Sequence, residues 1–345
     1  MVRASSRPEL LITAGNLSLD DTVNPDGQER AAPGGDALYS AVGAAIWRYP
    51  VTVLSRVGAD YPTAYRERIA GLGIGVDMIR TVPGPTVHYR ITNAQSGERQ
   101  YEHLTRAERL DELSPQGPDL EAVSRASWLH VAAMPIDRQE AVVARCRAER
   151  IPYSLDPHEE YIVGHESRLR ELIRGSLFMP SELEVRLMFP VLARERRPEA
   201  MARTAATQLL GIGARAVAIK LGASGCLVAD PSHRAVLPSL PVTVVDSTGA
   251  GDAFCGGFLA GYLRTGSPLL AAVCGTVSAG QVVSGFGALR SELPRPEVLR
   301  EQAALLLRNV DGALGSWGRL EAGFPSLMTR RNRRSSAGTG EEATG

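Results

Sequence analysis

The segment with the clearest chemical potential reads VDSTGAGDAF and runs from Val245 to Phe254. A short apolar run over residues 242–245, predicted to end a strand, leads into a turn of small residues. A helix follows directly, with Phe254, Phe258 and Tyr262 four residues apart. A glycine-rich turn that opens a helix leaves backbone N–H groups unpaired, and the helix dipole adds positive potential there. Such a turn predicts an anion site that a phosphate can approach closely.

Asp252 lies at the mouth of this predicted anion site, where a carboxylate is out of place unless it handles a proton. In phosphoryl transfer, the N–H groups of Gly249, Ala250 and Gly251 would stabilise the oxygens of the transferred group. A base acting on the incoming hydroxyl would help to align the nucleophile. The alternative is that Asp252 is only the N-cap of the helix, and the motif taken alone favours this cap. The sequence has no GxxxxGK(S/T), so the turn is not a Walker-type phosphate loop.

The elements that must position these residues alternate between strands and helices. Strands are predicted at residues 10–14, 51–54, 127–131, 153–155, 176–179 and 216–219. Helices are predicted at residues 37–47, 138–149, 165–174, 182–189 and 198–210. This alternation predicts an α/β fold with a mostly parallel central sheet covered by helices on both faces.

One segment departs from that alternation. Residues 86–92 alternate in character, turn through 94–98 and return over 99–101, which predicts a β-hairpin. Inserted in an α/β domain, the hairpin is expected to cover the ends of the parallel strands, where ligands bind. The alternatives are a hairpin that covers a sheet edge or one that pairs with another subunit. Because flap strands have exposed edges, we also expect a homodimer formed through them.

The segment DSTGAGDAF resembles the second signature of the ribokinase-like (PfkB) family of carbohydrate and nucleoside kinases, D-T-x-G-A-G-D-x-F. The last aspartate of that signature, here Asp252, is the catalytic base of the family. The first family signature, a Gly-Gly pair that opens a helix, is similar to PGGDALYSA at residues 33–41. The resemblance implies a three-layer α/β/α fold over residues 1–328, with a small lid formed by residues of about 15–30 and 86–103.

The resemblance also implies residues that bind the acceptor. Asp20, with Gly34 and Gly35, matches the positions that bind substrate hydroxyls, and a carboxylate can accept hydrogen bonds from two neighbouring hydroxyls. Without the family, Asp20 would be interpreted as a polar turn residue. Where sugar-binding relatives have an asparagine, this chain has Tyr39 or its neighbour Ser40. The identity of the acceptor, a sugar, a polyol or a nucleoside, is therefore open.

On the nucleotide side, Lys220, Gly222 and Gly225 resemble the strand and turn beside the ATP phosphates, where Lys220 would neutralise charge. The alternative for Lys220 is a strand-end lysine that faces solvent. Thr248 and Gly287 are also assigned to nucleotide binding by the resemblance.

Glu184 matches the glutamate of the family's Asn-x-x-Glu motif, which is associated with Mg²⁺ and phosphate placement, although Ser181 replaces the asparagine. Magnesium keeps several of its waters, so a glutamate can hold it through water. The alternative is a solvated helix glutamate. Some members of the family bind a monovalent cation such as K⁺ beside the anion site, and the carbonyls of Asp246 or Thr248 would contribute to it here.

Composition limits the partners. Of the 345 residues, 44% are hydrophobic and 22% are charged, and the formal net charge is zero, which argues against a nucleic acid or an anionic membrane as partner. Four cysteines without a CxxC pair predict free thiols in a reducing compartment. We found no signal peptide and no run of membrane-spanning length, which favours the cytoplasm. Residues 329–345 are almost devoid of apolar residues and are predicted to form a disordered tail.

The sequence therefore predicts a kinase that transfers the γ-phosphoryl group of Mg-ATP to a hydroxyl of a sugar or polyol, with Asp252 as general base. A nucleoside kinase of the same family is the alternative among enzymes. A sugar or nucleotide sensor with the same fold is the alternative outside enzymes, but a sensor has no need of the base in GAGD.

Overall fold

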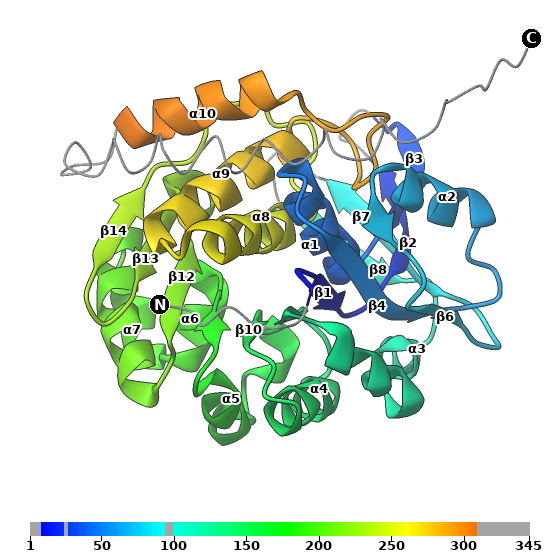
Figure 1. The fold of residues 1–345 in the computed structure, drawn as a ribbon, viewed down its shortest axis with the longest axis horizontal. Helices are drawn as coiled ribbons and strands as arrows, with labels where there is room; N and C mark the ends of the chain where they lie inside the picture. The colour runs from blue at the N-terminus through cyan, green and yellow to red at the C-terminus, as the bar shows by residue number, and fades with distance from the viewer. Residues whose placement is uncertain (1–7, 24–26, 94–98, 309–345) are drawn as a thin grey trace, which may run out of the picture.

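The computed structural model describes residues 8–23, 27–93 and 99–308. The hairpin turn at 94–98 and the predicted tail at 329–345 lie outside the described residues. Within the described part of the chain, helices and strands form three layers, with a central sheet between two sets of helices (Figure 1).

The central sheet has the strand order β14-β13-β12-β11-β10-β9-β1-β4-β5, and β6 also pairs with β4. Its strands are β1 (Leu11–Ala14), β4 (Val51–Val57), β5 (Ile74–Gly75), β6 (Ile79–Thr81), β9 (Trp128–Val131), β10 (Tyr153–Leu155), β11 (Leu177–Phe178), β12 (Ala216–Lys220), β13 (Cys226–Ala229) and β14 (Arg234–Leu237). Pairing is parallel from β5 to β12, and antiparallel between β12, β13 and β14. The carboxyl ends of the parallel strands therefore meet at one edge, where ligands bind in such sheets.

Helices cover both faces of this sheet, as Figure 1 shows, with α1, α8 and α9 on one side and α4 to α7 on the other. The helices are α1 (Asp36–Ile46), α2 (Thr63–Gly71), α3 (Glu108–Leu113), α4 (Ile136–Ala148), α5 (Glu166–Ile173), α6 (Glu182–Met188), α7 (Pro198–Ile212), α8 (Ala250–Thr265), α9 (Pro268–Val283) and α10 (Pro296–Arg308). Short 3₁₀ helices are η1 (Gly117–Arg125), η2 (Glu159–Tyr161), η3 (Pro190–Arg194) and η4 (Gly222–Ser224). The three-layer α/β fold predicted from the alternation of elements is confirmed.

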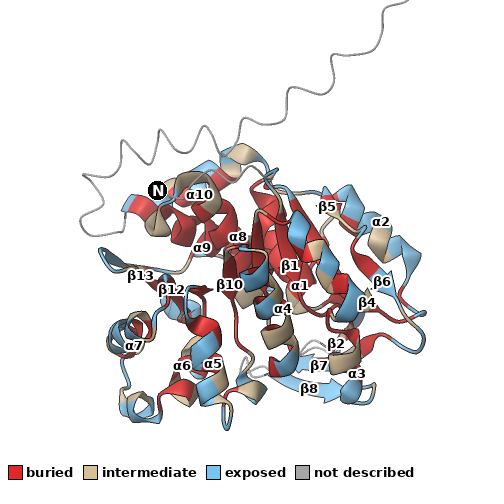
Figure 2. Ribbon diagram, turned by 60° about the horizontal axis from the view of Figure 1, so that its bottom comes forward, coloured by how far each residue is buried: buried red, intermediate tan, exposed pale blue. Residues whose placement is uncertain are grey.

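Two hydrophobic cores form because successive strand residues point to opposite faces. In β1, Leu11 packs into the core shared with α1, α8 and α9, while Ile12 packs into the core shared with α4 and α7. The stripe of Phe254, Phe258 and Tyr262 is buried in the first core. Figure 2 shows this interior as buried, with exposed residues on the outer helices and on the β7 and β8 strands.

A second, four-stranded sheet of order β3-β2-β7-β8 lies beside the central one. It consists of β2 (Ser18–Val23), β3 (Glu29–Gly34), β7 (Val87–Asn93) and β8 (Arg99–His103), and β7 and β8 form the predicted antiparallel hairpin. Strand β3 ends at Gly34, so the lid sheet leads directly into α1. The first signature, residues 33–41, therefore includes both the end of the lid sheet and the start of α1.

The prediction that residues 242–245 end a strand is wrong. These residues form no strand, and Val244 and Val245 are exposed. The amides of Val245 and Asp246 donate instead to the carbonyl oxygen of Val283, at 2.8 and 3.2 Å. The segment thus lies against the C-terminal end of α9 and does not extend the central sheet, whose edge strand on this side is β14.

No helix among the described residues combines the length and apolar character needed to span a membrane.

Candidate active site

The phosphate turn, defined here as residues 246–251, leads into α8 at the carboxyl edge of the sheet. Asp246 closes the turn, because its carboxylate accepts hydrogen bonds from the amide of Thr248 (2.9 Å) and from that of Gly287 (3.4 Å). The second bond joins the turn to the loop after α9. Asp246 therefore holds together Thr248 and Gly287, the two positions assigned to nucleotide binding.

Asp252 is the third residue of α8, and the helix N-cap is Gly249, which makes no side-chain cap. The alternative, in which Asp252 is only the N-cap of the helix, is therefore wrong. The first intrahelical bond of α8 is donated by Ala253 to the carbonyl of Gly249 at 2.9 Å, and the amide of Ala250 donates back to the carbonyl of Ser247 at 3.4 Å. The amide of Gly251 therefore belongs to the first turn, whose N–H groups have no partner within the helix. Asp252 is half-buried at this positive end of the helix.

The two signatures meet because α1 and α8 pack closely through glycines. A Cβ added to Gly43 would lie 2.1 Å from the carbonyl oxygen of Ala253, and one added to Gly256 would lie 1.7 Å from that of Ser40. Larger residues would force the two helices apart and would separate their N-termini.

Tyr39 packs directly under the phosphate turn. Gly249 has a φ of 70°, and a Cβ added there would lie 2.1 Å from the Tyr39 ring. Only 3% of Tyr39 is exposed. Tyr39, one of the two residues predicted to stand in place of the family's asparagine, thus supports the turn with its ring.

Asp20 lies inside strand β2 and is buried, so the alternative of a polar turn residue is wrong. Its carboxylate accepts a hydrogen bond from Ser18 Oγ at 2.7 Å. Gly34 makes room for it, because a Cβ there would lie 1.7 Å from Asp20 Oδ2. Burial raises the pKa of Asp20 to about 6, although the Ser18 bond opposes the rise. Gly35, with a φ of 100°, is the N-cap of α1.

Asp36, the first residue of α1, joins this acidic group. Burial raises the pKa of Asp36 well above its usual value, and the charges of Asp252, Asp156 and Asp20 add to the rise, while Lys220 opposes it. Asp36 therefore lies within electrostatic reach of both the predicted base and the predicted hydroxyl ligand. The sequence motif PGGDALYSA contained this residue, but its type alone did not distinguish it.

Tyr89 brings an aromatic ring from the lid to the same carboxylates. Burial raises the pKa of Tyr89, and the charges of Asp36 and Asp20 raise it further. Its ring meets that of His103 edge-on, with 4.7 Å between centroids. The predicted acceptor side thus combines Asp36 of α1 with Asp20 and Tyr89 of the lid sheet.

Lys220, at the end of β12, is buried in an ion pair, so the alternative of a solvent-facing lysine is wrong. Its Nζ lies 2.8 and 2.7 Å from the two carboxylate oxygens of Asp156. Sequence reasoning missed Asp156, although it directly follows the predicted strand at 153–155, on the edge where ligands bind.

The turn after β12 brings Gly222 and Gly225 to the same edge. A Cβ added to Gly225 would lie 1.9 Å from the carbonyl oxygen of Leu237, whereas nothing lies within 4 Å of a Cβ at Gly222. Gly225 therefore serves the packing of β14, and Gly222 leaves space beside Lys220.

Glu184 is the third residue of α6 and forms a capping box with Ser181. The amide of Ser181 donates to Glu184 Oε2 at 2.5 Å, and the amide of Glu184 donates to Ser181 Oγ at 3.3 Å. Only 6% of Glu184 is exposed, so the alternative of a solvated helix glutamate is wrong. Burial raises the pKa of Glu184 to about 8, with Lys220 opposing the rise and Asp156 adding to it.

The donor set fits a Mg²⁺ ion that is held through water. No cluster of three or more His, Cys, Asp or Glu suited to a metal ion occurs in residues 8–23, 27–93 and 99–308. Because one oxygen of Glu184 serves the capping box, the other can contact a water of an ion that also binds nucleotide phosphates.

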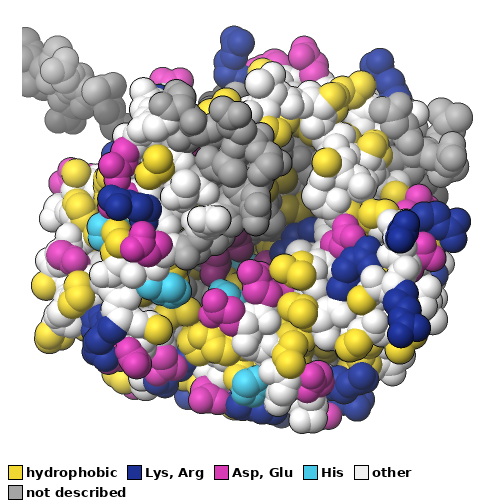
Figure 3. Space-filling view, turned by 180° about the vertical axis from the view of Figure 1, so that it is seen from behind, with side chains coloured by type: hydrophobic (Ala, Val, Ile, Leu, Met, Phe, Trp, Pro, Cys, Tyr) yellow, Lys and Arg dark blue, Asp and Glu magenta, His cyan; other side chains and the backbone are white. Residues whose placement is uncertain are grey.

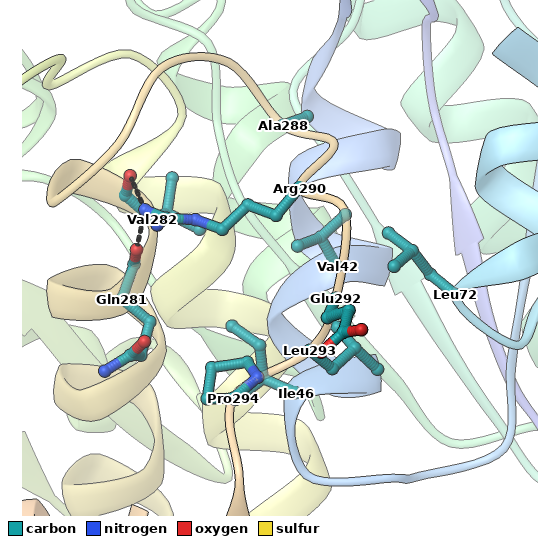
Figure 4. Close-up of a pocket in the computed structure, with 10 residues that line it drawn as sticks. All are labelled: Val42, Ile46, Leu72, Gln281, Val282, Ala288, Arg290, Glu292, Leu293 and Pro294. Carbon is teal, nitrogen blue, oxygen red and sulfur yellow. Dashed lines mark hydrogen bonds between the residues drawn. The ribbon is translucent and has the colours of Figure 1, made fainter. Parts of the chain in front are cut away.

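A small apolar pocket lies away from this site, between α1, α9 and the segment before α10 (Figure 4). Val42 and Ile46 line it from the C-terminal half of α1, whereas the site lies at the N-terminus of that helix. Arg290 reaches over it to donate to the carbonyl of Val282 at 3.1 Å. The pocket therefore does not belong to the predicted chemistry.

On the face turned away in Figure 1, Figure 3 shows acidic and histidine side chains beside a hollow.

The fold and this site define a class of protein. A small-molecule phosphotransferase requires a site for phosphate, a base and a site for the acceptor hydroxyl. The glycine-rich start of α8, the carboxylate on its first turn and the buried carboxylate in the lid sheet are placed to supply these three parts. The family model of pfkB family carbohydrate kinases matches residues 10–295, and the chain belongs to this family.

Relatives agree with this family. The chain is 30% identical to a cytidine kinase of Thermococcus kodakarensis, over 75% of this chain and 90% of that protein. It is 26% identical to a ribokinase of Bacillus subtilis, over 82% of this chain and 96% of the relative. A putative ribokinase II from E. coli in complex with ATP and Mg²⁺ has the same fold, with a TM-score of 0.71 at 21% identity, over 85% of this chain and 99% of that one. The protein is thus a kinase for a small sugar or nucleoside.

Proposed function

We propose that the protein transfers the γ-phosphoryl group of ATP to a hydroxyl of an uncharged sugar or polyol, with Asp252 as general base. The observation that carries this proposal is the place of Asp252. It is half-buried on the first turn of α8, next to the Gly251 amide at the positive end of the helix and within electrostatic reach of Asp36. A carboxylate so placed can take a proton from a hydroxyl that faces the anion site.

Each part of the site has a role in this proposal. Asp252 accepts the proton of the attacking hydroxyl, while the amides of residues 249–251 stabilise the charge on the transferred group. Asp20, with Gly34 and Gly35, orients the acceptor, and Tyr39 supports the turn from below. The lid sheet excludes water, which would otherwise compete with the acceptor.

The remaining predicted residues hold the nucleotide. Lys220, Gly222, Gly225, Thr248 and Gly287 would bind ATP, and Glu184 would hold a Mg²⁺ ion through water. Magnesium supplies charge neutralisation on the transferring phosphates when it is bound. The carbonyls of Asp246 and Thr248 are the groups that a monovalent cation such as K⁺ would use.

The charges around the acceptor favour a neutral molecule. The carboxylates of Asp20 and Asp252 both act on Asp36 from the acceptor side, and the cation that acts on Asp36, Lys220, is already paired with Asp156. A phosphate or carboxylate on the acceptor would meet this negative potential, so such molecules are disfavoured by repulsion.

A nucleoside acceptor is the second candidate, and two observations favour it. The relative that is 30% identical is a cytidine kinase. The Tyr89 ring lies close to Asp20 and Asp36, where it could stack on a base.

The cysteines and the edges of the lid sheet support proposals on the compartment and the oligomeric state of the protein. All four cysteines are buried and free, which suits a reducing cytoplasm. Strands β3 and β8 form the edges of the lid sheet, and pairing of such edges between two copies would give the expected homodimer.

The deciding experiment measures ADP release with Mg-ATP across matched acceptors: sugars, polyols and nucleosides, each beside its phosphorylated or carboxylated form. We expect turnover with one neutral class, and kcat/KM lower by about 100-fold or more for the anionic forms, because like charges brought together cost several kcal/mol. Turnover with anionic acceptors at equal efficiency would contradict the charge argument. Acceptor binding without ADP release would favour the sensor.

A further inference from the structure

Lys220 is the only lysine in the chain, among 38 lysines and arginines. Its surroundings suit an ammonium better than a guanidinium. Nζ lies within 2.8 Å of both Asp156 oxygens and 3.8 Å from Cys255 Sγ, and a Cβ added to Gly251 would lie 3.4 Å from it. A planar guanidinium is larger than an ammonium and would press on the backbone of the phosphate turn.

Asp156 is itself held firmly at the carboxyl end of β10. Its amide donates to the carbonyl of Val131 at 3.0 Å, and its carbonyl accepts from Gln139 Nε2 at 2.8 Å. Cys255 Sγ donates to Asp156 Oδ2 at 3.4 Å. Only 3% of the residue is exposed. Contacts from β9, α4 and α8 thus fix the position of the Asp156 carboxylate. The two hydrogen bonds from Lys220 to this carboxylate in turn fix the position of the ammonium.

We propose that Asp156 is a positioning residue for phosphoryl transfer, which holds the Lys220 ammonium against Gly251 of the phosphate turn and keeps it charged. The inference rests on the proposed function, since it takes the nucleotide phosphates as the group that Lys220 faces. The sulfur of Cys255 is a weak acceptor, so a phosphate oxygen can replace it as a partner of the ammonium while Asp156 keeps its two bonds.

Several charges act on Lys220 from the elements around it. Burial alone would lower the pKa of Lys220, but the negative charge of Asp156, with contributions from Glu184 and Asp252, outweighs burial and raises it well above its usual value. Asp36 from α1 and His130 from β9 also interact with it, and burial keeps His130 neutral by lowering its pKa to about 3. Without the Asp156 charge, burial would favour the neutral amine.

A single lysine allows a direct test by nuclear magnetic resonance. Full-length protein, with any tag free of lysine, is labelled with [¹³Cε]lysine, which gives one side-chain lysine signal. In the wild type the signal is expected to show no titration up to about pH 10.4, the ordinary lysine pKa. In Asp156→Asn the signal should titrate below that value. Mg-AMP-PNP should shift the wild-type signal.

Kinetics then separate positioning from stability. We expect Asp156→Asn to lower kcat by about 10- to 100-fold at neutral pH, the usual effect of losing an outer-shell partner. The loss should grow as pH rises through the new lysine pKa, whereas the wild-type profile should lack this falling limb. Asp137→Asn, which breaks the surface ion pair with Arg168, is the matched control and should leave the profile unchanged.

The double variant Asp156→Asn/Lys220→Met removes both charges and is the second test if Asp156→Asn alone does not fold. Because Asp156 acts through Lys220, the double variant should lose no more activity than Lys220→Met. Three results would overturn the proposal. The activity losses of the two single variants could multiply in the double variant, the pH profile of kcat in Asp156→Asn could run parallel to that of the wild type, or the lysine signal could titrate as in the wild type. An unmoved lysine signal would also overturn the proposal when calorimetry shows that Mg-AMP-PNP binds. Absence of nucleotide binding would instead contradict the proposed function, because the lysine titration does not depend on it.

Discussion

An amide at position 252 has almost the shape of the carboxylate but cannot take a proton at neutral pH. Because Gly249, and not Asp252, is the N-cap of α8, Asp252→Asn should leave the helix start intact. We expect kcat to fall by about 10³-fold, within the range for loss of a general base. Melting temperature and Mg-ATP affinity should change little.

Asp230→Asn is a suitable comparison, since Asp230 closes a surface turn through the amides of Ser232 and His233. That variant should keep full turnover. Near-normal turnover in Asp252→Asn would remove the base assignment, whichever acceptor is used.

The raised pKa of Asp20 predicts how the affinity for the acceptor depends on pH. Burial raises its pKa to about 6, and only the ionised carboxylate accepts hydrogen bonds on both oxygens. As pH falls through 6, Asp20 becomes protonated and the KM for the acceptor should rise, while the KM for ATP stays nearly constant. Steady-state kinetics between about pH 5 and 8, around the ordinary histidine range, cover the transition. Asp20→Asn should raise KM at every pH and remove its dependence on pH; a persistent dependence would assign the titration to another group.

At the scale of elements, the contact between Tyr39 and Gly249 makes the phosphate turn depend on α1. Gly249→Ala would place a Cβ 2.1 Å from the Tyr39 ring at a φ of 70°. We expect a loss of about 2–4 kcal/mol in the free energy of unfolding, from the positive φ and overpacking together. Urea denaturation measures this loss.

Gly211→Ala in α7 is the control, since nothing lies within 4 Å of its Cβ and the substitution favours helix. Gly249→Ala should cost less stability in a Tyr39→Ala background than in the wild type, because the ring is gone while the strain at φ remains. An equal cost in both backgrounds would show that the clash is not the cause.

Glu184 serves both the start of α6 and the predicted Mg²⁺ contact, and two substitutions separate these roles. Glutamine can replace glutamate in a capping box, so Glu184→Gln should keep stability while the Mg²⁺ concentration for half-maximal activity rises. Ser181→Ala should lower stability by about 1 kcal/mol, the usual cost of a lost N-cap. Thermal denaturation and Mg²⁺ titration of activity measure the two effects. An unchanged Mg²⁺ requirement in Glu184→Gln would limit this residue to capping.

At the scale of the whole molecule, the sequence predicted individual helices and strands better than it predicted which segments pair with one another. Periodicity marked the strands and helices of the parallel sheet because each is a local feature. Residues 242–245 were mistaken for a strand because apolar composition cannot tell whether a neighbouring strand exists. The Ser181–Glu184 capping box was readable from its spacing. Asp36 and Asp156 were missed, because they acquire a role only where α1, β10 and α8 converge; the position of Asp156 after a predicted strand was the one local signal.

The lid sheet joins the first signature to the hairpin, so closure of the lid should depend on both the acceptor and the nucleotide. Strand β3 ends at Gly34, and β7 pairs in parallel with β2, which carries Asp20. An acceptor that binds Asp20 therefore contacts the lid directly, whereas a nucleotide at the phosphate turn contacts mainly α8. With acceptor and Mg-AMP-PNP together, amide hydrogen exchange in β2 and β7 should slow by about tenfold or more, since exchange reports local opening. Exchange in α7, on the outer layer, should not change. Equal slowing by Mg-AMP-PNP alone would mean that the lid responds to the nucleotide, and slow exchange of β8 without any ligand would indicate that its edge pairs with a second copy.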